Sequence, residues 1–129
     1  MLEALGAVEI ISRQKLETKN RISLILLDSN FEIALKEFIV HNETLFPLSQ
    51  FNEAALKQLF KNRDDVINAV AQKVPIEQGL LDVAKHYYGK RNKLIHERAT
   101  VDIPDSDVRI YRGVIQKLLN KLYGLQFSR

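Results

Sequence analysis

The chain of 129 residues contains no cysteine. This absence excludes disulfide bonds, thiolate nucleophiles and the usual structural zinc sites, which depend on cysteine ligands. A chain without cysteine suits a reducing compartment. We therefore expect a cytoplasmic protein.

Long apolar runs are also missing from the sequence. No stretch approaches the roughly 18 apolar residues that a membrane-spanning helix needs, and the N-terminus lacks the basic-then-apolar pattern of a signal peptide. We expect no membrane partner. Because the chain opens without any preamble, we also expect it to be a piece of a longer protein.

Glycine and proline are scarce, with five and three residues respectively. No stretch combines sustained strand alternation with turn signals. A length of 129 residues fits one domain, and 46% apolar with 27% charged residues is ordinary for a globular protein. The sequence thus predicts an all-α fold, a compact bundle of four to six helices.

The strongest helical pattern covers residues 21–43. Its first apolar arc has the three- and four-residue spacing of one helix face, and it consists of Leu24, Leu27, Phe31, Ala34, Leu35 and Phe38. A second apolar arc lies almost opposite and consists of Ile22, Leu26, Ile33 and Val40. A helix that is apolar on two sides needs cover on both. We expect the N-terminal segment or a second copy of the chain to cover the second arc.

Residues 2–19 also show helical spacing, and this helix either continues into the next one or turns near Asn20. We expect residues 1–19 to form an N-terminal helical extension that packs on the bundle or links it to an upstream region. Residues 20–129 would form the helical domain. Caps are expected at Ser49 for the next helix and at Asn62 or Asp64 for the one after it.

Asp28 falls inside the first apolar arc, and Glu32 lies at its edge. Two interpretations are open. Asp28, Glu32 and Lys36 are four residues apart and would form an exposed ladder of ion pairs. Alternatively, a carboxylate points inward and holds a cation that comes from elsewhere in the chain.

The most basic stretch is 85–98, with five basic side chains and one acidic one. If residues 76–98 form one helix, Arg91 projects from its apolar face, where a guanidinium needs a counter-ion. We expect Asp28 or Glu32 to orient Arg91. His96 lies about 140° around the helix from Arg91 at 100° per residue, and Asn92 is one turn before His96.

The run Arg91-Asn92-Lys93-Leu94-Ile95-His96 resembles the Arg-Asn-x3-His form of the Arg-x4–6-His signature of the HEPN superfamily. These proteins are small helical bundles of RNA-processing, toxin–antitoxin and phage-defence systems. The Leu-Leu-Asp-Ser-Asn-Phe-Glu-Ile-Ala-Leu-Lys run at 26–36 is similar to the opening helix of that superfamily. The resemblance covers roughly residues 20–124.

The resemblance implies a homodimer in which two copies of the motif face each other across a cleft. It also implies an endoribonuclease that needs no metal and no cofactor, acts on single-stranded RNA, and has an antitoxin or a larger parent protein as a further partner. His96 would take the proton from a ribose 2′-hydroxyl, and Arg91 would stabilise the charge on the phosphoryl oxygens. Asn92 would orient the imidazole or the phosphate.

Three basic side chains would hold the flanking RNA backbone through contacts that are blind to sequence: Lys90, Lys93 and Arg98. The chain departs from some toxin relatives, which carry a tyrosine at the position of Arg98, so mechanisms that depend on that tyrosine do not carry over.

Two other functions remain open. One is a non-catalytic module that binds nucleic acid or nucleotide or mediates dimerisation. The other is an interaction bundle in which Arg91 is a buried structural ion.

Overall fold

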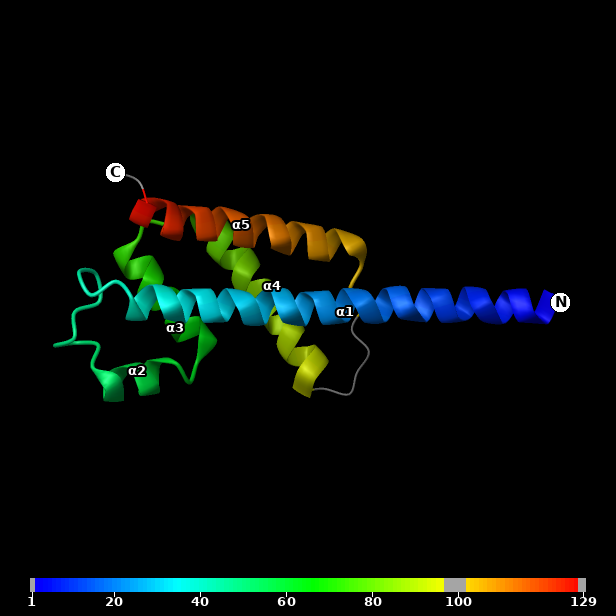
Figure 1. Cartoon of the computed structure of the whole chain (residues 1–129), viewed down its shortest axis with the longest axis horizontal. Coiled ribbons are helices and arrows are strands. Elements are labelled where there is room, and N and C mark those ends of the chain that lie inside the picture. The colour runs from blue at the N-terminus through cyan, green and yellow to red at the C-terminus, as the bar shows by residue number, and fades with distance from the viewer. Residues whose placement is uncertain (1, 97–101, 128–129) are drawn as a thin grey trace.

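The computed structural model describes residues 2–96 and 102–127, and within them the side chains of 18–96 and 102–124. This part of the chain contains five α-helices and no strand (Figure 1). The helices are α1 (Leu2–Val40), α2 (Glu53–Leu59), α3 (Arg63–Lys73), α4 (Gln78–His96) and α5 (Asp105–Phe127). The predicted all-α bundle of four to six helices is therefore confirmed.

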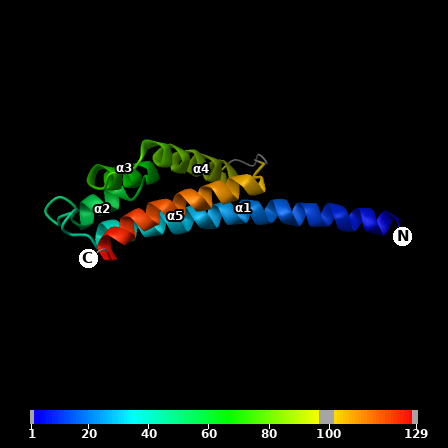
Figure 2. The same cartoon turned by 90° about the horizontal axis from the view of Figure 1, so that it is seen from above.

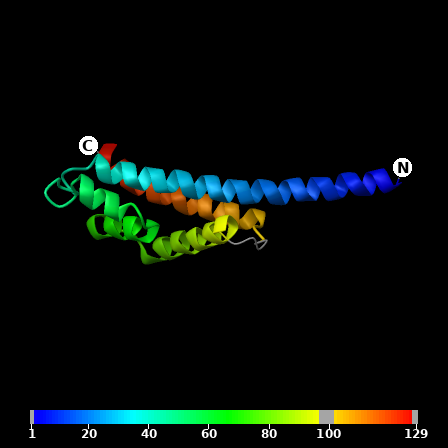
Figure 3. The same cartoon turned by 90° about the horizontal axis from the view of Figure 1, so that it is seen from below.

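The first helix is continuous. α1 has 39 residues, which makes it about 58 Å long at a rise of 1.5 Å per residue. The open question of a turn near Asn20 is thereby resolved, because the helix runs straight through this residue. Figures 2 and 3 show that the other helices lie beside the C-terminal half of α1, and that its N-terminal part extends past them.

The core forms where three helices pack on the C-terminal half of α1, namely α3, α4 and α5. From α1 it takes Leu24, Phe31, Leu35, Phe38 and Ile39, which are all buried. All of them except Ile39 belong to the first apolar arc that the helical spacing predicts. Aromatic rings contribute edge contacts, such as that of Phe31 with Tyr111, whose centroids are 6.5 Å apart. The core therefore follows one face of α1 over most of the bundle.

The opposite face of α1 is not covered by any described residue. Ile22, Leu26, Ile33 and Val40 are 52%, 56%, 58% and 45% exposed. At 100° per residue these four side chains project almost opposite to Asp28 and the core. We call them the outer stripe. From the sequence, we expected the N-terminal segment or a second copy of the chain to cover this second apolar arc. No described residue of the chain covers it.

The short helices begin at asparagine caps. Asn52 accepts a hydrogen bond from the backbone amide of Ala55 at 2.9 Å, so α2 begins there and the expected cap at Ser49 is wrong. Asn62, one of the two caps expected for the next helix, accepts from the amide of Asp64 at 2.9 Å. The next residue, Arg63, is therefore the first of α3.

The motif lies in the last two turns of α4. This helix buries Leu81, Ala84 and Tyr87 and crosses the core side of α1 (Figure 1). Arg91 and Asn92 follow one turn after Tyr87, and His96 is the last residue of the helix. None of the helices in the described residues is both long and apolar enough to cross a membrane.

Candidate functional site

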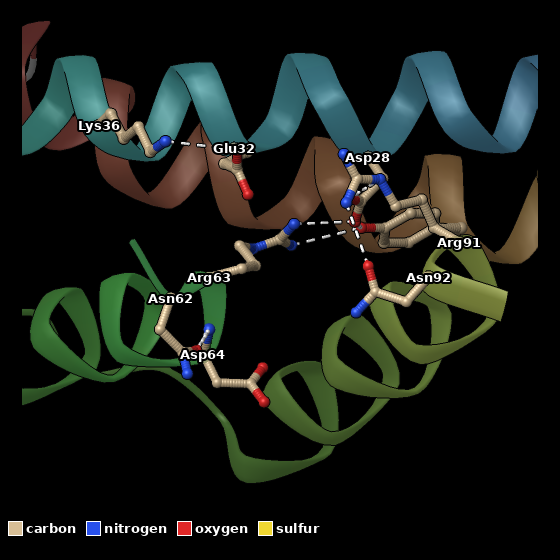
Figure 4. Close-up of polar contacts among 9 residues, drawn as sticks. Asp28, Glu32, Lys36, Asn62, Arg63, Asp64, Arg91 and Asn92 are labelled. Carbon is tan, nitrogen blue, oxygen red and sulfur yellow. Dashed lines mark hydrogen bonds and ion pairs between the residues drawn. The ribbon is translucent and has the colours of Figure 1, made fainter. Parts of the chain in front are cut away.

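The centre of the site is the carboxylate of Asp28, which is completely buried on the core face of α1. A buried carboxylate is costly unless it is paired and hydrogen-bonded. Its partners come from three other helices, as Figure 4 shows for those it labels. We call Asp28, Arg63, Arg91 and Tyr111 the Asp28 cluster.

Arg63 is the closest cation to Asp28. Its Nη1 donates to Oδ1 of Asp28 at 2.8 Å, and its Nη2 donates to the hydroxyl of Tyr111 at 3.4 Å. The guanidinium, only 2% exposed, lies 4.7 Å from the ring centroid of Phe31 and 5.0 Å from that of Tyr88. Burial acts to lower the pKa of Arg63, but the carboxylate of Asp28 and the hydroxyl of Tyr111 outweigh it and raise the pKa. Arg63 therefore stays charged inside the core.

Tyr111 completes the hydrogen bonding of Oδ1 of Asp28. Its ring is fully buried on α5, and its hydroxyl donates to the same oxygen that accepts from Arg63. Burial and the adjacent charge of Asp28 raise the pKa of Tyr111 well above its usual value. The phenol thus remains a hydrogen-bond donor throughout the physiological range.

Arg91 faces the other oxygen of Asp28. Its Nε lies 3.6 Å from Oδ2, an ion-pair distance beyond hydrogen-bond length. Its Nη1 donates to the side-chain oxygen of Asn92 at 3.1 Å (Figure 4), and its guanidinium carbon lies 5.8 Å from the ring centroid of Tyr88. The side chain keeps 20% of its surface exposed. Arg91 is therefore oriented from behind by Asp28 while part of it still reaches solvent.

The two expected counter-ions differ in the structure. Asp28 lies beside Arg91 as described, whereas Glu32 pairs with Lys36 at 3.3 Å on its own helix. Of the two open interpretations, the inward-pointing carboxylate thus describes Asp28 and the helical ion-pair ladder describes Glu32 with Lys36.

His96 does not join the Asp28 cluster. It is exposed at the end of α4 and forms no hydrogen bond or ion pair with any residue in the described part of the chain. The five-residue separation from Arg91 directs the two side chains about 140° apart on the helix. Within one chain the guanidinium of Arg91 and the imidazole of His96 therefore project from different sides of α4.

The three basic residues expected to hold RNA differ in their surroundings. Lys93 is exposed. Lys90 forms an ion pair with Asp107 at 2.7 Å, and Tyr87 donates to the same carboxylate at 3.0 Å. Arg98 lies outside the described residues. Of the three, Lys93 is the residue that the structure shows to be open to a ligand.

Tyr87 connects the pair formed by Lys90 and Asp107 with the Asp28 cluster, because its ring stacks on Tyr111 at 5.0 Å between centroids. Burial, followed by the hydrogen bond to Asp107, raises the pKa of Tyr87 to about 12. Burial acts to raise the pKa of Asp107, but hydrogen bonds from Lys90 and Tyr87 lower it below the usual value. The last turns of α4 are thus attached to the start of α5 by charged groups.

Sequence reasoning missed Arg63 and Tyr111. Arg63 did carry a signal, because a cation in the first turn of a helix opposes the helix dipole and implies a carboxylate elsewhere. Tyr111 adjoins the more hydrophobic Ile110 on α5. Ile110 is 51% exposed, and Tyr111 is buried.

Comparison of the chain with protein-family models, curated proteins and solved structures finds no significant match. The described residues contain no group of three histidine, aspartate or glutamate side chains that could hold a metal ion. The chemistry of the site is therefore argued from its own geometry. It combines an arginine anchored by a buried carboxylate with an exposed histidine on the same helix.

Proposed function

We propose that this protein is a metal-independent endoribonuclease that acts as a homodimer on single-stranded RNA. The observation that carries the proposal is the anchoring of Arg91 by the buried carboxylate of Asp28, five residues before the exposed His96 on the same helix. A role in RNA processing, a toxin–antitoxin pair or phage defence belongs to the same proposal, as do a cytoplasmic location and an antitoxin or larger parent protein as partner.

The proposed reaction is an intramolecular transesterification that cuts the RNA backbone. His96 accepts the proton of a ribose 2′-hydroxyl, and the oxygen attacks the adjacent phosphorus. The bond from phosphorus to the 5′-oxygen of the next nucleotide breaks, and this leaving oxygen takes a proton from water while His96 returns its proton to the solvent. The products therefore carry a 2′,3′-cyclic phosphate and a 5′-hydroxyl. Arg91 donates to the phosphoryl oxygens as negative charge builds there, and Asn92 keeps its guanidinium in place.

The geometry of α4 supports a dimeric site. Arg91 and His96 point about 140° apart, so one chain does not direct both side chains to one phosphate from the same face. Two copies of α4 that face each other would place these groups on opposite walls of a shared cleft. Lys93 and Arg98 would hold the flanking phosphates, whereas Lys90 is already paired with Asp107.

The test is cleavage of single-stranded RNA in the presence of EDTA. We expect His96→Ala to lose cleavage by at least about 100-fold, the usual contribution of a general base. His86→Ala is the matched control, because His86 is an exposed histidine on the same helix. Circular dichroism checks that both variants fold. Cleavage that persists in His96→Ala, or that stops with EDTA, contradicts the proposal.

The outer stripe favours a second candidate, a non-catalytic module that dimerises through α1. Its four exposed aliphatic side chains lie along one side of α1. The exposed Lys19 and Glu37 near its two ends would approach each other in an antiparallel pair. Such a dimer buries the side of α1 opposite Asp28 and leaves the two copies of α4 facing outward. Sedimentation of Ile33→Lys beside the unchanged chain separates the candidates. A dimer that Ile33→Lys dissociates, together with no cleavage of RNA, supports the module.

A further inference from the structure

A second group of basic side chains lines a cavity of about 410 Å³ between α1 and the start of α5. The first turns of α5 lie beside the middle of α1 (Figures 1 and 2). The cavity is lined by Lys19, Asn20, Ser23, Asp105, Val108, Arg109 and Arg112. We call it the α1–α5 pocket. It contains no residue of the motif and none of the Asp28 cluster.

A hydrogen bond between the two helices holds the pocket together. The side-chain amide of Asn20 on α1 donates to Oδ1 of Asp105, the first residue of α5, at 2.8 Å. Arg109 and Arg112 follow on α5, three residues apart and therefore on one side of the helix. Lys19 and Ser23 face them from α1. The positions of the walls are thus set by the packing of the two helices.

The charge of the pocket is strongly unbalanced. Three cationic side chains and one carboxylate line it, and the carboxylate of Asp105 is engaged by Asn20. Within the described residues, Lys19, Arg109 and Arg112 form no ion pair or hydrogen bond. Arg63 and Arg91, in contrast, both pair with Asp28. Three cationic groups beside one carboxylate leave a net positive charge, which attracts an anion.

We infer that the α1–α5 pocket binds a phosphate group carried by a nucleotide or an oligonucleotide. Each guanidinium offers a planar fork of donors that matches two phosphate oxygens, Lys19 adds a third cation, and Ser23 adds a hydroxyl donor. The volume admits a phosphate with part of the group attached to it. This site is independent of the proposed ribonuclease chemistry, because it shares no residue with it.

The experiment compares two double variants of the full chain. Arg109→Gln with Arg112→Gln removes two charges from the pocket. Lys117→Gln with Lys121→Gln removes the same charge from α5 outside the pocket. Binding of inorganic pyrophosphate and of ATP is measured by calorimetry, and binding of a short single-stranded RNA by fluorescence anisotropy, all at one salt concentration. Thermal unfolding verifies that both double variants fold.

We expect the pocket variant to bind the phosphate probes at least about tenfold more weakly, since it loses two guanidinium groups that can form charge-assisted hydrogen bonds with phosphate. The control variant should change less than about twofold. A loss for pyrophosphate, ATP and RNA assigns the site to oligonucleotides as well, and a loss for pyrophosphate and ATP alone assigns it to nucleotides. No binding of any probe, or equal losses in both variants, overturns the inference. His96→Ala should bind the probes normally, so failure of the ribonuclease proposal is distinguishable.

Discussion

The molecule contains two pairs of arginines in opposite surroundings. Arg63 and Arg91 share the buried carboxylate of Asp28. Arg109 and Arg112 instead line a surface pocket in which the one carboxylate, that of Asp105, accepts a hydrogen bond from Asn20. The first pair is held by the fold and helps to define it. The second pair is held only by its helix and is open to a ligand. The comparison shows that arginine side chains are paired and largely buried in one region and are exposed without an ion pair in the other, within the described residues.

The largest effect should follow from removing the carboxylate that the first pair shares. Asp28→Ala leaves two guanidinium groups in the core without a counter-ion, and breaking a buried pair in this way costs about 3–5 kcal/mol. We expect a loss of about 5 kcal/mol in the free energy of unfolding, measured by urea denaturation. Glu32→Ala, four residues along the same helix, should cost less than about 1 kcal/mol because its pair with Lys36 is partly exposed. Equal losses would contradict the central role of Asp28.

A smaller effect should come from matched substitutions in the two arginine pairs. Arg63→Gln leaves Asp28 with Arg91 and Tyr111, so we expect a loss of about 3 kcal/mol in the free energy of unfolding. Arg109→Gln, in the α1–α5 pocket, should change it by less than about 0.5 kcal/mol. Urea denaturation of both variants measures this difference. A comparable loss at Arg109 would show that the pocket arginines stabilise the fold.

The smallest effect concerns Asp107, in the first turn of α5. Its carboxylate forms an ion pair with Lys90 on α4. Its pKa in the folded protein lies below the usual value of 3.8, because the hydrogen bonds from Lys90 and Tyr87 outweigh burial. The unfolded chain therefore binds this proton more tightly. The resulting stability is present above pH about 4 and is lost as the pH falls through the folded-state pKa.

We expect Asp107→Asn to reduce the acid-dependent loss of stability below pH about 5. Urea denaturation at several pH values measures the slope. The control is Asp102→Asn, a change at an exposed aspartate shortly before α5. An unchanged slope in Asp107→Asn would show that the ion pair with Lys90 contributes no pH-dependent stability.

The sequence was sufficient for the helical class, and it offered the inward-pointing carboxylate of Asp28 as one of two alternatives. The arc from Leu24 to Phe38 has one helical period, and a carboxylate buried inside that arc needs a partner. Arg91 was expected to be a partner because its guanidinium also projects from an apolar helix face and needs a counter-ion. These conclusions depend on spacing within one helix, which the sequence shows directly.

The rest depends on contacts between helices that are distant in the chain. Arg63 is 35 residues from Asp28, and Tyr111 is 83 residues away, so no local pattern connects them. The burial of Tyr111 in place of its neighbour Ile110 has a related reason. Neighbouring residues differ by 100°, and hydrophobicity alone favoured Ile110 over Tyr111, whose hydroxyl needs a buried partner. Only the position of Asp28 resolves that choice.

The Asp28 cluster has a consequence for how the protein opens. Four helices contribute a side chain to it: α1, α3, α4 and α5. If α3 or α5 separates from the bundle, Asp28 loses a neutralising or hydrogen-bonding partner, and its remaining attraction concentrates on Arg91. Loosening of α3 or α5 therefore alters the force on the arginine proposed to stabilise the transition state. A ligand that selects such a loosened state would regulate the site without touching it.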